Sequence, residues 1–214
     1  MRPHVIVNCA MTADGKIAGK ARKQVRISSP EDLDRVRRLR TESDAILVGV
    51  NTIIADDPHL TVRGLDRDRN PLRVVLDSNG RTPERAKVLD DRARTLVATC
   101  EGCARTWEGA EVVRMGRDRV DLHALMRELE TRGVRRLMVE GGGETIWSFF
   151  NEGLVDEYLV FVGSMVLGGR TSPSPVDGEG FEEGRCVNLG LAESQVLGSG
   201  ILLRYEVLRD VPPA

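Results

Sequence analysis

The feature that most constrains the fold is a series of short apolar runs that end in polar residues. Residues 45–50 are apolar or glycine throughout, without the polar alternation of a half-exposed strand. Such a run is typical of a strand covered on both faces in a parallel sheet. Similar runs lie at 5–7, 74–76, 96–98 and 137–139. Since parallel strands need crossover connections, the pattern predicts an α/β protein.

Helix signals separate these runs. Ser29 can act as an N-cap before Pro30, and acidic residues follow in the first turn. Leu122, Leu125, Met126 and Leu129 have helical spacing and precede Gly133, which ends the helix. Residues 158–162, 165–167 and 201–208 are predicted as further strands. We therefore predict a single domain over residues 1–214, with a mostly parallel central sheet flanked by helices and antiparallel C-terminal strands.

Charge and apolar patterning narrow the class of partner. Lys and Arg total 31 against 33 Asp and Glu, for a net charge of −2. Proteins that bind nucleic acid or membrane surfaces normally carry clustered excess charge, so neither partner is expected. The sequence shows no long apolar span and no signal-peptide pattern, which predicts a soluble cytoplasmic protein.

The cysteines raise the question of a metal or redox site. Cys100 and Cys103 have CxxC spacing, but no second pair and no HxxxH follows. A structural zinc site needs four ligands at regular spacing. We predict passive, reduced thiols and no metal.

The strand at 137–139 leads into a candidate ligand site. Glu140 follows it, then Gly141, Gly142 and Gly143, and then an amphipathic helix. Backbone NH groups in a glycine turn at a helix N-terminus form a seat for phosphate. An ordinary strand-to-helix turn with surplus glycines is the alternative.

Other predicted strands also end in polar residues. Thr12 and Asp14 follow the first run, Thr52 and Asp56 the run at 45–50, and Asp77–Ser78 the run at 74–76. The ribose and 2′-phosphate of a dinucleotide could be bound by an acidic residue, a hydroxyl and an arginine, which this strand end offers in Asp77, Ser78 and Arg81. Ends of parallel neighbours meet at one edge of a sheet, where α/β proteins bind ligands. The alternative for the segment from Asn51 to Pro58 is a helix-and-turn connection with Asp used for capping. There is no GxGxxG after a first strand, which disfavours a standard Rossmann domain.

The combined segments resemble the reductase family of riboflavin biosynthesis, whose fold is that of dihydrofolate reductase. The resembling segments are 11–16, 49–52, 55–58, 60–63, 77–78 and 140–143. Segments 26–28, 153–157 and 176–181 are similar to the free-standing archaeal form, which reduces 2,5-diamino-6-ribosylamino-4(3H)-pyrimidinone 5′-phosphate. The zinc signature of the deaminase fused to bacterial relatives is absent, so we expect a substrate that still carries its 2-amino group.

The resemblance implies NADPH as cofactor, a small phosphorylated pyrimidine as substrate and a homodimer. It assigns cofactor contacts to Ala10, Thr52, Asp56, Ser78, Gly141, Gly142, Gly143, Glu144 and Thr145. It assigns substrate contacts to Arg40, Leu60, Arg63 and Glu140, with the arginines suited to the 5′-phosphate because their guanidinium fork can bind it in a bidentate manner.

Hydride transfer to the ribose also needs a proton donor. Asp56 is the first candidate by position and Glu140 the second, and a bound water is a third. Three other functions stay open: reduction of the deaminated uracil substrate, reduction of a pteridine or folate, and nucleotide binding without catalysis.

Overall fold

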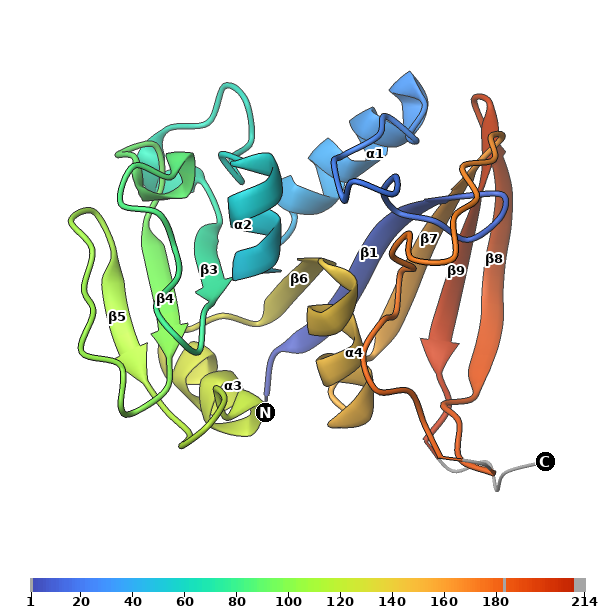
Figure 1. Ribbon diagram of the computed structural model, residues 1–214. Coiled ribbons are helices and arrows are strands. Elements are labelled where there is room, and N and C mark those ends of the chain that lie inside the picture. Colours follow the sequence, from blue (N-terminus) through green and yellow to red (C-terminus); the bar gives the residue numbers. More distant parts are fainter. Residues whose placement is uncertain (1, 183, 210–214) are drawn as a thin grey trace. The chain divides into compact units, whose positions relative to one another are not determined.

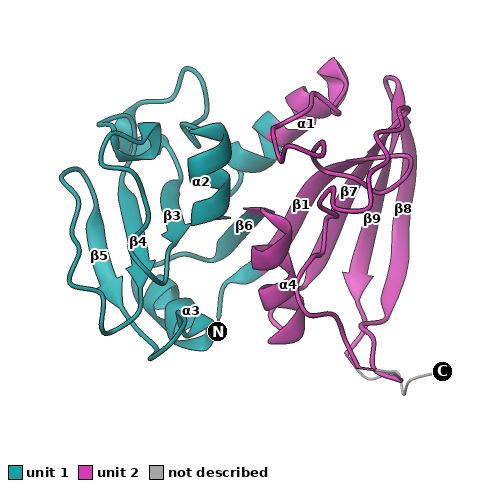
Figure 2. Ribbon diagram, viewed as in Figure 1, with its two compact units in different colours: residues 1–4, 37–139 teal, residues 5–36, 140–214 magenta. Residues whose placement is uncertain are grey.

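The computed structural model describes residues 2–182 and 184–209. The chain divides into two compact units, one formed by residues 1–4 and 37–139 and the other by residues 5–36 and 140–214 (Figure 2). The single domain expected over residues 1–214 stays a prediction.

In the first unit, four strands lie side by side, each parallel to the next: β2 (Ala45–Gly49), β3 (Leu72–Leu76), β4 (Thr95–Thr99) and β5 (Glu111–Arg114). β6 (Arg136–Gly141) begins in this unit beside β2, which gives the order β5-β4-β3-β2-β6. Every residue of β2 and β4 is buried. The uninterrupted apolar runs therefore form strands covered on both faces, as predicted.

Two helices connect the strands of the first unit (Figure 1). α2 (Val50–Asp56) leads from β2 to β3, and α3 (Leu122–Thr131) leads from β5 back to β6. The two connections run in opposite directions along the sheet, so right-handed crossovers place the helices on opposite faces. The predicted apolar stripe of α3 is buried, and Gly133 adopts φ +83° just beyond its end. Two single turns, η1 (Arg67–Arg69) and η2 (Lys87–Leu89), lie in the loops.

The second unit carries the antiparallel strands. β1 (His4–Thr12) pairs in parallel with β7 (Glu157–Gly163). β9 (Gly200–Val207) runs antiparallel to β7, and β8 (Leu189–Leu197) runs antiparallel to β9. α4 (Gly143–Asn151) buries Ile146, Phe149 and Phe150. The predicted fold class, a mostly parallel α/β arrangement with antiparallel C-terminal strands, is confirmed.

α1 (Pro30–Thr41) begins as the sequence indicates, because Ser29 Oγ accepts a hydrogen bond from Asp32 N. The spacing of Leu33, Val36 and Leu39 predicts one apolar face for this helix, and this prediction is partly wrong. Leu33 is exposed, whereas Asp32 is fully buried and binds Arg35 Nε at 2.8 Å. The helix therefore turns an ion pair inward where a leucine was expected.

Two strand predictions fail in the second unit. Residues 165–167 form no strand, since their backbone is held by the Asp14 side chain and by a tight turn at Gly163. β8 was missed, because most of its residues are exposed and it lacks the alternation of a half-buried strand. None of the helices in the described residues is long and apolar enough to cross a membrane.

Candidate functional site

The glycine loop after β6 has the shape expected of an anion seat. Gly141 adopts φ +116°, and Gly142 occupies the N-cap of α4 without any side chain. The start of α4 therefore presents backbone NH groups and the positive end of its dipole. Thr145 is buried in the first turn, and Glu144 is exposed.

A second segment packs on this loop and explains Gly143. A Cβ at Gly143 would lie 2.6 Å from the carbonyl oxygen of Ser174, so only glycine permits this approach. Asp177 N donates to Gly143 O at 3.2 Å, and Asp177 Oδ1 accepts from the Ser174 hydroxyl at 2.7 Å. The 174–177 turn is thus fixed against the start of α4.

The turn continues over the α4 surface. Trp147 and Phe181 meet edge to face with ring centroids 4.6 Å apart. Gly178 lies against the Trp147 ring at a point where a Cβ would approach it to 2.1 Å. The 176–181 segment, one of those that resemble the archaeal form, therefore covers the helix that follows the glycine loop.

Ala10 and the end of β1 lie in the same unit. Ala10 pairs with Phe161 of β7 and is half-buried. The polar residues beyond it have a structural role: Asp14 accepts hydrogen bonds from the Thr12 hydroxyl at 2.5 Å and from the backbone of residues 167 and 168. The hydroxyl contact and then the backbone contacts lower the pKa of Asp14 to about 2.

In the first unit, Thr52 and Asp56 lie on one face of α2. They are four residues apart in the same helix and are both half-buried. Beyond them the chain turns sharply, with Asp57 at φ +43° and Leu60 at φ +51°. Leu60 is almost completely buried.

The structure also brings Arg40, Leu60 and Arg63 together. Arg40 Nη1 donates to Thr61 O at 3.5 Å, and Arg37 Nη2 donates to Arg63 O at 3.1 Å. The C-terminal end of α1 therefore lies along the 60–63 segment. Arg63 itself is exposed.

The end of β3 partly corrects the prediction. Asp77 is fully buried and uses its carboxylate to accept from Arg81 N, Thr82 N and the Thr82 hydroxyl at 2.6–2.9 Å. It shapes the loop and presents no oxygen to a ribose. Ser78 is half-buried, and its hydroxyl accepts from Val120 N at 3.1 Å.

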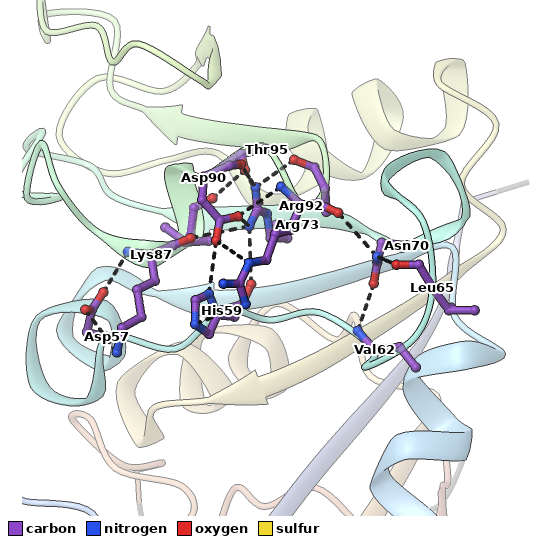
Figure 3. A network of polar contacts seen from close by, with 12 residues as sticks. Asp57, His59, Val62, Leu65, Asn70, Arg73, Lys87, Asp90, Arg92 and Thr95 are labelled. Carbon is purple, nitrogen blue, oxygen red and sulfur yellow. Dashed lines mark hydrogen bonds and ion pairs between the residues drawn. The ribbon is translucent and has the colours of Figure 1, made fainter.

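Sequence reasoning missed a polar network beside the 57–63 segment (Figure 3). Its centre is Arg73, in β3, which has no exposed surface and hydrogen-bonds to Asp90 and Thr95. The signal was a single arginine inside an otherwise apolar strand. A charge at such a position is buried only when it is paired.

These features define an α/β protein of the dihydrofolate reductase-like kind, with a glycine-capped helix in one unit and a strained loop beside arginines in the other. The family model described as "RibD C-terminal domain" matches residues 3–203. The chain belongs to this family, which confirms the resemblance to the riboflavin biosynthesis reductases.

Two archaeal relatives are similar over most of their length. A Methanothermobacter thermautotrophicus protein named 2,5-diamino-6-ribosylamino-4(3H)-pyrimidinone 5′-phosphate reductase is 46% identical over 215 residues, 97% of this chain and 99% of its own. A protein of the same name from Archaeoglobus fulgidus is 49% identical over 195 residues, which is 85% of this chain and 89% of the relative.

Solved structures show the same fold. A Thermotoga maritima deaminase/5-amino-6-(5-phosphoribosylamino)uracil reductase has a TM-score of 0.84 and 25% identity, and the match covers 97% of this chain and 57% of that one. The riboflavin biosynthesis reductase Rib7 of Saccharomyces cerevisiae has a TM-score of 0.78 at 20% identity, with 97% and 90% covered.

Proposed function

We propose that this protein is an NADPH-dependent oxidoreductase of riboflavin biosynthesis. It would reduce the ribosyl group of 2,5-diamino-6-ribosylamino-4(3H)-pyrimidinone 5′-phosphate to the ribitylamino form. The observation that carries the proposal is the 46% identity with the Methanothermobacter reductase over nearly the full length of both chains.

The glycine loop fits the pyrophosphate of a dinucleotide. Gly141, Gly142 and Gly143 leave the start of α4 free of side-chain bulk, and the helix dipole favours an anion there. We assign Glu144 and Thr145, in the first turn of α4, to the same group, together with Ala10 on β1. In the first unit we assign Thr52, Asp56 and Ser78 to the cofactor. When bound, NADPH would supply the hydride that reduces the ribose C1′ carbon.

The substrate would be held by Arg40, Leu60, Arg63 and Glu140. Arg40 and Arg63 are assigned to its 5′-phosphate, for which charged guanidinium groups are suited. Leu60 lies in the same segment as Arg63 and is almost completely buried. The protein must also deliver a proton to the nitrogen or ring oxygen of the opening ribose. Asp56 is the first candidate for this role and Glu140 the second.

We further propose that the protein acts in the cytoplasm as a homodimer. β8 supports the second proposal, because it is an edge strand with exposed Leu191 and Val196. Apolar side chains along an unpaired strand edge favour association with another chain. Sedimentation of wild type and of Val196→Glu tests this point, since a monomeric wild type would contradict it.

The function is tested by following NADPH oxidation with the diamino substrate and its deaminated uracil analogue side by side. Faster turnover of the diamino compound supports the proposal. Preference for the uracil would make the chain a reductase of the type named for the Thermotoga structure. NADPH binding without oxidation of cofactor by either compound would leave a nucleotide-binding module.

A further inference from the structure

We propose that Arg73 is a positioning residue which, through Asp90 and His59, holds residues 57–63 in the conformation that binds the substrate. The inference rests on the proposed function, because that function assigns Leu60 and Arg63 to the substrate. Arg73 would touch neither substrate nor cofactor.

The segment needs to be held because its backbone is strained. Asp57 and Leu60 adopt φ values of +43° and +51°. Residues with a Cβ rarely occupy this region, and a leucine gains no local hydrogen bond there to offset the cost. Strain of this kind persists only where surrounding contacts enforce it, and it gathers at ligand-binding sites.

Arg73 supplies the central anchor. Its Nη1 donates to the His59 carbonyl oxygen at 3.3 Å and to Asp90 Oδ1 at 2.8 Å. The other oxygen of Asp90 meets His59 Nδ1 at 3.1 Å. His59, which directly precedes Leu60, is therefore held by both its backbone and its side chain (Figure 3).

All three nitrogen atoms of the Arg73 guanidinium donate hydrogen bonds. Its Nε donates to the Thr95 hydroxyl at 2.9 Å, and its Nη2 donates to the carbonyl oxygens of Asp90 and Ala93 at 2.5 and 2.6 Å. Burial lowers the pKa of the guanidinium, while Asp90 acts in the opposite direction. A planar guanidinium with five fixed donors orients the groups around it more firmly than an ammonium would.

Two further contacts fix the segment on either side of His59. Asp57 Oδ1 accepts from Lys87 N at 2.8 Å. Val62 N donates to Asn70 Oδ1 at 2.8 Å, and Asn70 in turn donates to Leu65 O at 3.0 Å. Asp57 is thus anchored directly, Leu60 follows the anchored His59, and the His59 anchor depends on Arg73 and Asp90.

The direction of the His59 bond gives a sharp test. A carboxylate can only accept, and the pKa of Asp90 is lowered: burial would raise it, but hydrogen bonds from Arg73 and others outweigh burial. Nδ1 must therefore donate in this contact. His59→Asn places an amide NH₂ near the Nδ1 position, whereas His59→Leu keeps the bulk without a donor.

The experiment compares His59→Leu, His59→Asn and Arg73→Lys with wild type. In His59→Leu and Arg73→Lys we expect the KM for the pyrimidine phosphate to rise about ten-fold, the effect of one lost hydrogen bond to a charged group, with kcat and the KM for NADPH nearly unchanged. Amide hydrogen exchange across residues 57–63 should accelerate in the same variants. His59→Asn should restore the substrate KM and the exchange rate to the wild-type values. A general loss of stability in the His59 variants would not allow this recovery.

Arg92→Ala is the matched control. Arg92 also contacts Asp90, at 3.3 Å, and its Nη1 lies 3.5 Å from His59 Nε2, but its side chain is largely exposed, and such contacts contribute little. Unchanged exchange across 57–63 in His59→Leu and Arg73→Lys would overturn the inference, and so would faster exchange with an unchanged substrate KM. If Arg73→Lys fails to fold, His59→Leu still decides. If wild type reduces neither pyrimidine, the proposed function fails, and the exchange experiment still decides whether the network fixes the segment.

Discussion

Arg73 and Asp90 form an ion pair with Nη1 and Oδ1 2.8 Å apart, in which the arginine side chain has no exposed surface and the aspartate is about a quarter exposed. The pair joins β3 to the turn after η2. The same guanidinium donates to the carbonyl groups of residues 59, 87, 90 and 93, which lie in the loop after α2 and around η2.

Arg73→Met should therefore destabilise the protein strongly. The change leaves several buried carbonyl groups without a donor, and each such unsatisfied group typically costs about 1–3 kcal/mol. Urea unfolding measures the loss. Arg92→Ala, which removes a mostly exposed partner of the same aspartate, should cost less than about 1 kcal/mol. Similar losses in the two variants would show that burial of Arg73 is energetically unimportant.

Gly143→Ala should weaken both folding and NADPH binding. The new Cβ would meet the Ser174 carbonyl oxygen at 2.6 Å, so either the 174–177 turn or the start of α4 must move. Overpacking of this kind costs about 1–3 kcal/mol. Thermal unfolding and titration with NADPH provide the measurements. Gly19→Ala, where a Cβ meets nothing within 4 Å, is the control and should behave like wild type in both.

The lowered pKa of Asp14 should make the free energy of unfolding fall as the solution becomes acidic. Its pKa is lowered in the folded protein from 3.8 to about 2, so the unfolded chain binds the proton more readily. The stabilisation is present above the unfolded pKa and is lost as pH falls from about 4 to about 2. Asp14→Asn lacks this contribution. Urea unfolding at about pH 6 and about pH 3 should give a smaller pH-dependent loss in Asp14→Asn than in wild type. Equal losses would contradict the assignment.

The elements that could be predicted from the sequence are those whose buried positions require apolar residues. β2, β4 and the apolar stripe of α3 are buried where their patterns indicated. β8 was not predicted, because an exposed edge strand is set by pairing with β9 and needs no apolar alternation. The predicted apolar face of α1 was wrong at Leu33, which is exposed, because the ion pair of Asp32 and Arg35 lies on the buried face of the helix.

The site shows the same division. The glycine loop was recognised because a turn that leads into a helix leaves a local signature, and α4 begins at the predicted glycines. The predicted ribose contact of Asp77 was wrong. In a sequence, an aspartate at a strand end looks the same whether its carboxylate binds a ligand or the following loop. The His59–Arg73–Asp90 network joins residues far apart in sequence, and no local pattern reports such contacts.

Asp56→Asn tests the proton donor. Asparagine keeps the size of the side chain at the end of α2 but cannot release a proton, so turnover should fall far more than the free energy of unfolding. Loss of a general acid lowers kcat by about 10²–10⁴-fold. Steady-state kinetics with NADPH and the diamino substrate measure the effect, and Glu140→Gln provides the comparison. A normal kcat in Asp56→Asn would remove this residue from the chemistry and leave Glu140 or a bound water as donor.

Arg63→Ala tests the phosphate contact. Arg63 is exposed, and Arg37 contacts its backbone carbonyl and not its side chain, so truncation of the side chain should leave the fold intact. Loss of a charged hydrogen-bond partner costs about 1.5–3 kcal/mol, which raises the KM for the phosphorylated substrate about 10- to 100-fold. The dephosphorylated substrate should be affected far less, because it lacks the group that the guanidinium binds. Arg38→Ala, also exposed on α1, is the control and should leave both KM values unchanged. Equal losses of affinity for the two substrates in Arg63→Ala would place this arginine away from the phosphate.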